Sequence, residues 1–431
     1  MTDIPSDRVV ESTGHSGQRV LDELFVTVIM ARVTDHFGFF VYAFASVLVF
    51  PKVFFSYADP ATAMLLSFMV FPLAFLVRPF ASQVFKLLEP RFGRSGKVAA
   101  AIGILCISTM AIGLLPSYES AGMLAPVLLI ALRVAQGIGL GGGWDGLTLL
   151  LQTNAPENRR GWYAMIPQLG APIGLCVAAA IFYVLTGFLT EQEFYQWGWR
   201  WPFFAVLAVN VVSLFARLQL IHSKEHVELQ KEQQLYSSPF FEMLRAHWRG
   251  VLLGTLLPLA SYALMHMVSV FPLAHMVLTN QAPISDFLFV EIMGGALFIV
   301  AVVMSGVLAD MIGRRRLLAA TSVLIGGYSF LITTLFDGGI VFTLFGFLLL
   351  GLSYGQASSI LPNRFEKKYR YTAAALSTNL SWIFGAAFAP LVALWLSQTY
   401  GLASAGLYLL SGALVTLGAL AVLKYRVRPA R

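Results

Sequence analysis

Long apolar stretches without a single charged residue recur along this chain from one end to the other. Residues 60–77, 98–118 and 161–190 are three examples. A helix crosses the hydrocarbon core of a bilayer with roughly 20 mostly apolar residues, and it satisfies its backbone hydrogen bonds within itself. The repetition therefore predicts a bundle of membrane-spanning helices. The composition agrees, because 58% of the residues are hydrophobic and only 12% are charged.

Gly, Pro and charged residues divide the apolar stretches into separate expected helices. The longest polar break inside the chain covers residues 222–249 and separates six helices from six. The predicted fold class is an all-α membrane protein with twelve transmembrane helices in two six-helix halves. The predicted parts are an N-terminal tail (1–22), a first half (23–221), a linker (222–249), a second half (250–423) and a C-terminal tail (424–431). The helices are expected at residues 23–50, 61–86, 98–116, 124–147, 164–187, 201–221, 250–277, 286–309, 317–336, 339–361, 372–396 and 402–423.

The positions of the positive charges indicate how the helices are oriented. Cytoplasmic segments of membrane proteins carry an excess of Lys and Arg. With twelve spans and both termini cytoplasmic, only Lys52 and Arg200 of the 29 Lys and Arg residues fall on the opposite side. Three others, Arg32, Arg78 and Arg133, fall within spans. We therefore predict a monomeric, multi-pass protein of a bacterial inner membrane with both termini in the cytoplasm.

The predicted topology can be tested by labelling. A single cysteine introduced at Gln230 is expected to react with a membrane-impermeant thiol reagent only from the cytoplasmic side. One introduced at Asp337 is expected to react only from the opposite side. Right-side-out and inverted vesicles separate the two outcomes, with the unsubstituted chain as the control. Labelling of both positions from the same side would contradict the arrangement of twelve spans.

Ionisable side chains inside predicted spans are candidates for function, because an unpaired charge in the bilayer costs several kcal/mol. Asp35 lies about twelve residues into the first span and Arg133 about nine into the oppositely directed fourth span, so a rise of ~1.5 Å per residue places both at a central depth. We predict that they form an ion pair whose acid can be neutralised by one proton. The alternative is a purely structural ion pair, although buried pairs stabilise less than apolar packing does.

A guanidinium group at membrane depth is suited to bidentate binding of a carboxylate. Arg78 is such a group, and the alternative is that it extends toward the cytoplasmic surface. Arg200 is a second candidate, with an interfacial anchor beside neighbouring tryptophans as its alternative role. Other polar or aromatic residues at span depth are candidates for the substrate pocket, each with helix packing as the alternative. They are His36, Tyr42, Gln168, Tyr262, Gln356, Asn379 and Trp382.

The sequence contains no pattern typical of an enzyme, a metal site or a cofactor site. Residues 137–142 match a dinucleotide-binding pattern formally, but they lie inside an apolar helix, where that pattern has no such meaning. Cys106 and Cys176 lie in apolar stretches and form no spaced set. His266 and His275 are nine residues apart and face opposite sides of a helix. The net charge of +7 is explained by topology, and no nucleic-acid partner is expected, because no basic domain with interleaved aromatic residues is present.

The two halves repeat each other. The tripeptide 92–94 (Phe-Gly-Arg) after the second span recurs as 312–314 (Ile-Gly-Arg) after the eighth. Arg159 and Arg160 before the fifth span are matched by Arg370 before the eleventh. Parallel repeats of this kind place a substrate between the halves, near the middle of the membrane.

Several motifs resemble those of the major facilitator superfamily. Residues 306–316 (Gly-Val-Leu-Ala-Asp-Met-Ile-Gly-Arg-Arg-Arg) are similar to its loop signature, and residues 133–139 (Arg-Val-Ala-Gln-Gly-Ile-Gly) to its fourth-span signature. Residues 77–79, 160–163, 167–172, 197–203 and 370–372 are together similar to its metabolite:proton symporters. The resemblance implies a coupling role for Arg133. It also implies a latch between the halves formed by the gating-loop residues Arg94, Asp310, Gly313 and Arg314.

The resemblance implies a proton-coupled transporter that imports a small organic solute by alternating access. Acids usual in the family are absent at Gly38 and Gly143, and Pro90 replaces the acid of the first-half loop. Because Arg78, Arg133 and Arg200 remain, we expect a positive cavity that favours a carboxylate or polycarboxylate, including a carboxylate siderophore. Two alternatives stay open: a drug or metabolite exporter of the same fold, and a membrane sensor that does not transport.

Overall fold

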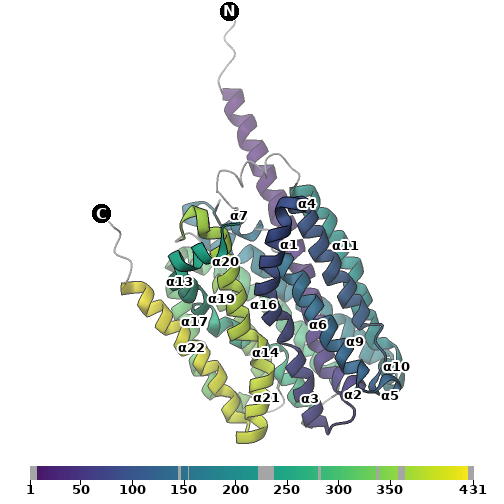
Figure 1. The fold of residues 1–431 in the computed structure, drawn as a ribbon. Helices are drawn as coiled ribbons and strands as arrows, with labels where there is room; N and C mark the ends of the chain where they lie inside the picture. Colours follow the sequence, from purple (N-terminus) through teal and green to yellow (C-terminus); the bar gives the residue numbers. More distant parts are fainter. Residues whose placement is uncertain are drawn as a thin grey trace, which may run out of the picture.

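The computed structural model describes residues 7–143, 147–153, 155–221, 237–279, 283–335, 339–357 and 365–425. Within these ranges the chain is helical and contains no strand (Figure 1). Helix α1 (Asp7–Leu48) runs down from the top of Figure 1, and α22 (Leu402–Tyr425) runs up from the bottom. The first helix therefore begins, and the last one ends, on the same side of the bundle. We call this side the terminal end and the opposite side the far end.

Twelve crossing helices can be traced in the described part of the chain, as the sequence predicts. Eleven of them are long and apolar enough to span a bilayer by themselves. The ninth consists of α17 (Arg314–Phe330) followed by α18 (Ile332–Leu335), which matches the expected span 317–336. The all-α fold of two six-helix halves is thus confirmed.

The first half contains six crossing helices and several short connecting ones. The second and third crossings are continuous in α4, and Gly93 separates them with a φ of +70°, a conformation that glycine adopts without steric cost. Asp59 begins the second crossing by accepting hydrogen bonds from the backbone N–H groups of Ala61 and Thr62. The elements after α1 are α2 (Phe50–Phe54), α3 (Pro60–Val70), α4 (Leu73–Ile112), α5 (Tyr118–Ala121), α6 (Leu124–Gly142), α7 (Leu147–Thr153), η1 (Glu157–Arg159), α8 (Arg160–Met165), η2 (Ile166–Leu169), α9 (Gly170–Phe188), α10 (Glu191–Gln196), η3 (Gly198–Arg200) and α11 (Trp201–Ile221).

The second half repeats this arrangement with its own interruptions. The seventh crossing of the chain, the first of this half, is divided into three helices. The eleventh crossing contains a π-helical turn, η5 (Trp382–Ala387). Such turns often occur at functional sites. The remaining elements are α13 (Phe240–Leu256), α14 (Leu259–Ser269), α15 (Phe271–Thr279), α16 (Ile284–Ile312), α19 (Ile340–Ala357), α20 (Lys367–Ser381) and α21 (Ala389–Tyr400).

Two predicted boundaries differ from the structure. The expected linker 222–249 overlaps α13, which begins at Phe240; residues 222–236 lie outside the described residues. The start of α13 ahead of the expected span is stabilised by packing, because Met243 is buried and Glu242 accepts a hydrogen bond from the Tyr369 hydroxyl on α20. The expected N-terminal tail is also helical from Asp7 onward as part of α1, whereas residues 1–6 and most of the C-terminal tail (426–431) lie outside the described residues.

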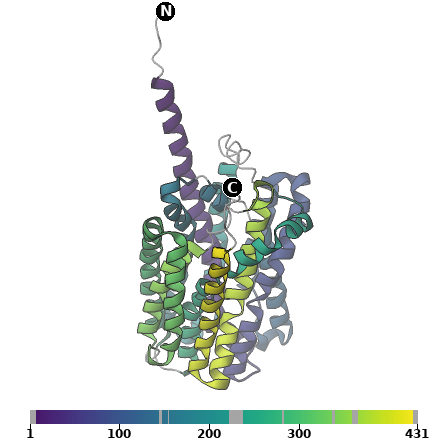
Figure 2. The ribbon, with the colours of Figure 1, turned by 90° about the vertical axis from the view of Figure 1, so that its left-hand side faces the viewer.

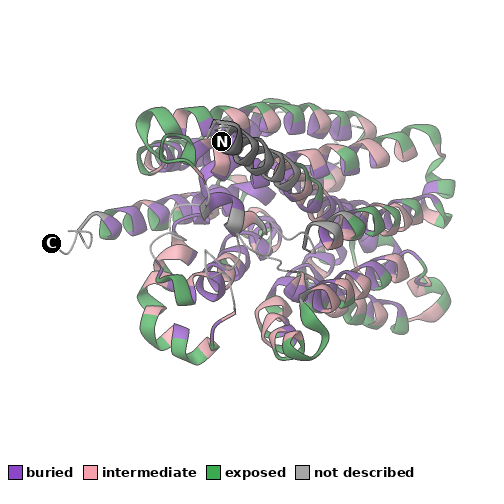
Figure 3. Ribbon diagram, turned by 90° about the horizontal axis from the view of Figure 1, so that it is seen from above, coloured by how far each residue is buried: buried purple, intermediate pink, exposed green. Residues whose placement is uncertain are grey.

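The halves contact each other along several pairs of helices. The helices α8 and α9 of the first half lie against α16 of the second, and α3 lies against α15 and α21 at the far end. Buried residues face the middle of the bundle and exposed residues face outward (Figure 3). Figure 2 shows that the first turns of α1 extend beyond the bundle at the terminal end. The outer faces carry large apolar side chains such as Phe80, Phe188 and Phe215, as expected for surfaces that contact lipid.

Candidate substrate site

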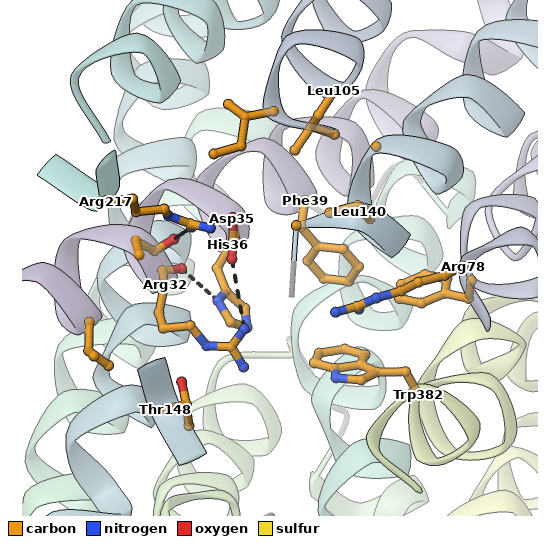
Figure 4. A pocket seen from close by; sticks show the side chains of 16 residues that line it. Arg32, Asp35, His36, Phe39, Arg78, Leu105, Leu140, Thr148, Arg217 and Trp382 are labelled. Atoms are coloured by element: carbon orange, nitrogen blue, oxygen red, sulfur yellow. Dashed lines mark hydrogen bonds and ion pairs between the residues drawn. The ribbon is translucent and has the colours of Figure 1, made fainter. Parts of the chain in front are cut away.

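A cavity lies between the halves in the terminal-end part of the bundle. Its walls come from α1, α4, α6, α7 and α11 of the first half, and Trp382 closes it from the second half. Figure 4 shows Asp35 and its arginine partners on one side, with Arg78 and Trp382 on the other. The lining residues are Val28, Ala31, Arg32, Asp35, His36, Phe39, Phe75, Arg78, Ile102, Leu105, Gly139, Leu140, Gly143, Thr148, Arg217 and Trp382.

Asp35 lies between two arginines on one wall of the cavity. Nη2 of Arg217 donates to Oδ1 of Asp35 at 3.0 Å and to the Ala31 carbonyl at 2.8 Å. Nη1 of Arg32, one turn earlier on α1, lies 3.7 Å from Oδ2 of Asp35. The side chain of Arg217 is only 3% exposed, whereas that of Asp35 is 26% exposed. The carboxylate therefore neutralises a buried cation while it stays accessible from the cavity.

Arg78 extends from α4 into the cavity, opposite this cluster (Figure 4). Among the described residues no carboxylate pairs with its guanidinium group. Among the described residues that line the cavity there are three arginines, Arg32, Arg78 and Arg217, and one carboxylate, that of Asp35. A cavity with this excess of positive charge can bind an anion without introducing a new unpaired charge.

His36 connects the two halves beside the cavity. Its Nδ1 donates to the Arg32 carbonyl at 2.7 Å, and its Nε2 lies 3.3 Å from the hydroxyl of Tyr354 on α19. In the neutral ring Nδ1 is the donor and Nε2 accepts from the tyrosine. The His36 side chain is thus held in a fixed orientation by one residue from each half.

Aromatic rings from both halves meet at the deep end of the cavity, and we call this group the aromatic layer. Trp382 stacks on Phe75 with 5.7 Å between ring centroids, and it lies 5.6 Å from Phe39 and 4.7 Å from Tyr262. His266 lies 5.2 Å from Phe39. On the far-end side of the layer, residues 40–48 of α1 are all buried. The layer consists of Phe39, Phe71, Phe75, Tyr262, His266 and Trp382.

The structure does not contain the predicted ion pair between Asp35 and Arg133. Nε and Nη2 of Arg133 donate to the Phe71 carbonyl at 3.2 and 3.0 Å, and Nη1 donates to Gln136 at 2.9 Å. This carbonyl is free because, at the break between α3 and α4, the N–H of Phe75 bonds to the Pro72 carbonyl instead. The prediction used depth alone, and equal depth does not determine which way a side chain points around its helix.

Several other predicted pocket residues do not line this cavity. Tyr42 is buried beneath the Arg133 guanidinium, whose carbon lies 3.6 Å from the ring centroid. Arg200 donates to the carbonyls of Gly113 and Leu115 at 2.7 and 2.9 Å, which is a structural role at the end of α4. Gln356 donates to the Gly161 carbonyl at 3.0 Å and so connects the halves. Gln168 and Asn379 are buried in helix contacts as well.

Two arginines that line the cavity, Arg32 and Arg217, are not among the site residues predicted from the sequence. Arg217 was counted among the cytoplasmic charges because it lies near the end of its span, and Arg32 was assigned to a span without a partner. A signal was present for Arg32, because it precedes Asp35 by three residues and i, i+3 neighbours meet on a helix. For Arg217 no local signal existed, since its partner lies 182 residues away.

The gating-loop residue Asp310 bridges the halves at the terminal end. Its Oδ1 accepts from the backbone N–H of Gly161 at 2.6 Å and its Oδ2 from that of Trp162 at 3.1 Å. A Cβ on Gly161 would lie 2.8 Å from Oδ1, so only glycine allows this approach. Gly313 ends α16 with a φ of +89° and Arg314 begins α17. The side chain of Arg94 lies outside the described residues.

We expect the substitution Asp310→Asn to favour opening at the terminal end. Hydrogen bonds to a charged group contribute about 1.5–3 kcal/mol, and the amide keeps only one of the two acceptors. The alkylation rate of a cysteine placed at Thr148, which lines the cavity, should rise about tenfold. Asp286→Asn in the exposed first turn of the same helix is the matched control. An unchanged rate in Asp310→Asn would show that this contact does not hold the halves together.

The fold and the site define a membrane transporter with two six-helix halves around a central cavity. The chain belongs to the major facilitator superfamily, because the sugar (and other) transporter family matches residues 26–245 and 222–425. It is 38% identical over 411 residues to the inner membrane metabolite transport protein YhjE of Escherichia coli (strain K12), with 93% of each chain covered. It is 29% identical to the shikimate transporter of the same strain, over 89% of this chain and 90% of that protein.

A solved structure shares the fold. The crystal structure of a D-xylose-proton symporter matches with a TM-score of 0.69 at 16% identity, over 94% of this chain and 97% of the other. The matching family and the curated relatives are transporters, so the chain is a multi-pass membrane transporter of the metabolite and sugar transporter family and not an enzyme.

Proposed function

We propose that this protein carries a small carboxylate or polycarboxylate across the inner membrane together with protons. The observation that carries the proposal is Arg78, whose guanidinium group faces the cavity and has no carboxylate partner among the described residues. A substrate carboxylate placed between Arg78 and the opposite cluster would complete the charge balance of the cavity. The similarity to a shikimate transporter supports this substrate class, since shikimate carries a carboxylate. A carboxylate siderophore belongs to the same class.

Proton coupling follows from competition for the arginines. Asp35 and a substrate carboxylate are both partners for Arg32 and Arg217, and Asp35 is accessible from the cavity. Protonation of Asp35 removes its charge and leaves the guanidinium groups to the substrate. When the substrate departs, the arginines favour the ionised Asp35 again, and the proton is released. The similarity in fold to a proton symporter is consistent with such a cycle.

The proposed orientation assigns the cavity to one side of the membrane. With both termini in the cytoplasm, the cavity lies on the cytoplasmic side and the aromatic layer separates it from the periplasm. Opening at the far end requires the rings of Phe39 and Phe75 to separate from Trp382. The proposed cycle therefore rocks the two halves about this layer.

Uptake in membrane vesicles tests the proposal and separates it from its two alternatives. Radiolabelled citrate, shikimate and glycine betaine are offered with and without an imposed pH gradient, acidic outside. Import of a carboxylate that depends on the gradient supports the proposal. Extrusion driven by the same gradient would indicate an exporter. Binding without any flux would indicate a sensor.

A further inference from the structure

Glu291 is a membrane-embedded acid outside the cavity. It lies on α16, about 10 Å from the far-end start of that helix at ~1.5 Å per residue. Its side chain is 0% exposed, and neither carboxylate oxygen has a hydrogen-bond partner among the described residues. An ionised carboxylate in such a position would cost several kcal/mol. Glu291 is therefore uncharged in this conformation.

Glu291 lies at a contact between the two halves. α16 belongs to the second half and packs against α9 of the first. One residue after Glu291, the Ile292 carbonyl accepts from the thiol of Cys176 on α9 at 3.7 Å. Nearby, the rings of Tyr183 on α9 and Phe289 on α16 lie 6.0 Å apart. The two halves therefore meet beside Glu291, and the contact between α9 and α16 helps to enclose its carboxyl group.

No described element packed on α16 offers Glu291 a cation close by. The thiol of Cys176 is the titratable group that interacts with it from α9. The charged groups on α8 and α17, and Asp310 on α16 itself, lie at the terminal end, and Asp286 is exposed in the first turn. The titratable and charged groups on α16 and on the elements around it are Arg160, Tyr163, Cys176, Tyr183, His275, Asp286, Asp310, Arg314, Arg315, Arg316, Tyr328 and Tyr354.

We propose that Glu291 is a proton-binding site that controls closure of the far end. The halves close there around the neutral acid, because closing around the ionised form would bury an unpaired charge. When α9 and α16 separate, water reaches the carboxyl group and it can lose its proton to the far-end solution. Acid on that side therefore favours closure and alkali favours opening. This site is separate from Asp35 and goes beyond the proposed symport.

Distances between spin labels on α9 and α16 test the inference without any ligand. Labels are attached to cysteines at Phe188 and Ser285, in a full-length background with Cys106→Ala and Cys176→Ala. As the pH rises, the ratio of open to closed distances should increase by up to tenfold per pH unit, the limit for one titrating proton. Glu291→Gln should keep the closed distance at every pH, and Asp286→Asn should behave like the unsubstituted background.

Infrared spectroscopy supplies a second readout that does not depend on the folding of a variant. The unsubstituted protein at neutral pH should show the band of a protonated carboxylic acid. As the pH rises, this band should disappear while the far end opens. The proposal would be overturned if the distances between the spin labels did not change with pH, or if the Glu291→Gln variant kept the full pH response. The absence of a protonated acid at neutral pH would overturn it as well. A pH-dependent closure in a protein without proton-driven uptake would support Glu291 and refute only the proposed symport.

Discussion

Arg78→Gln is expected to weaken binding of a carboxylate substrate by about tenfold or more. Each hydrogen bond between a guanidinium and a carboxylate contributes about 1.5–3 kcal/mol, and a tenfold change corresponds to about 1.4 kcal/mol. The structure makes the loss specific, because Arg78 faces the cavity and no carboxylate of the described residues pairs with it. Arg78→Lys should recover only part of the affinity, since an ammonium group lacks the bidentate geometry.

Thermal-shift and calorimetric titration with citrate and shikimate measure this effect on the purified protein. Arg91→Gln is the matched control, because Arg91 is an exposed arginine on the same helix α4. It should leave the affinity unchanged. If the preferred ligand is neutral or cationic, or if Arg78→Gln binds the carboxylate as well as the unsubstituted protein, the assignment of a carboxylate substrate fails.

Asp35→Asn is expected to abolish uphill uptake while leaving exchange intact. The amide resembles the protonated acid, so the arginines remain available to the substrate and the cavity persists. Without a titrating group at this position, however, the pH gradient no longer drives accumulation. The ratio of internal to external substrate should fall to about one, the value for passive equilibration.

Counterflow and concentrative uptake, measured in the same proteoliposomes, distinguish the two activities. Arg217 loses the carboxylate of Asp35 in this variant, and breaking a buried pair can cost about 3–5 kcal/mol, so the thermal stability of the variant is measured in parallel. Asp286→Asn serves again as the control for loss of an acid outside the cavity. Concentrative uptake at the unsubstituted level in a stable Asp35→Asn protein would exclude Asp35 as the coupling acid.

Most of the architecture could be predicted from the sequence because it depends on local chemistry. A bilayer requires about 20 apolar residues per crossing, and this requirement leaves a signal that each span carries by itself. The ninth span illustrates this, since its expected range 317–336 corresponds to α17 and α18 even though the crossing is divided between two helices. Helix starts stabilised by distant contacts were less predictable. α13 begins at Phe240, where Glu242 and Met243 pack against α20, and the charged residues Glu242, Arg245 and Arg249 interrupt the apolar pattern there.

The sequence by itself also determined several side chains of the candidate site. Asp35, Arg78 and Trp382 could be selected because polar and aromatic groups at membrane depth need a reason to be there, and all three line the cavity. The sequence likewise suggested Asp310 as a latch through its resemblance to a known loop. The tertiary structure decided how these groups are paired. Asp35 binds Arg217 from α11, and Arg133 binds the Phe71 carbonyl at a helix break. A pairing depends on the rotation of each helix about its axis and on which helices are neighbours. Depth along a span fixes neither, so only the packed bundle could show which arginines the cavity leaves to a substrate.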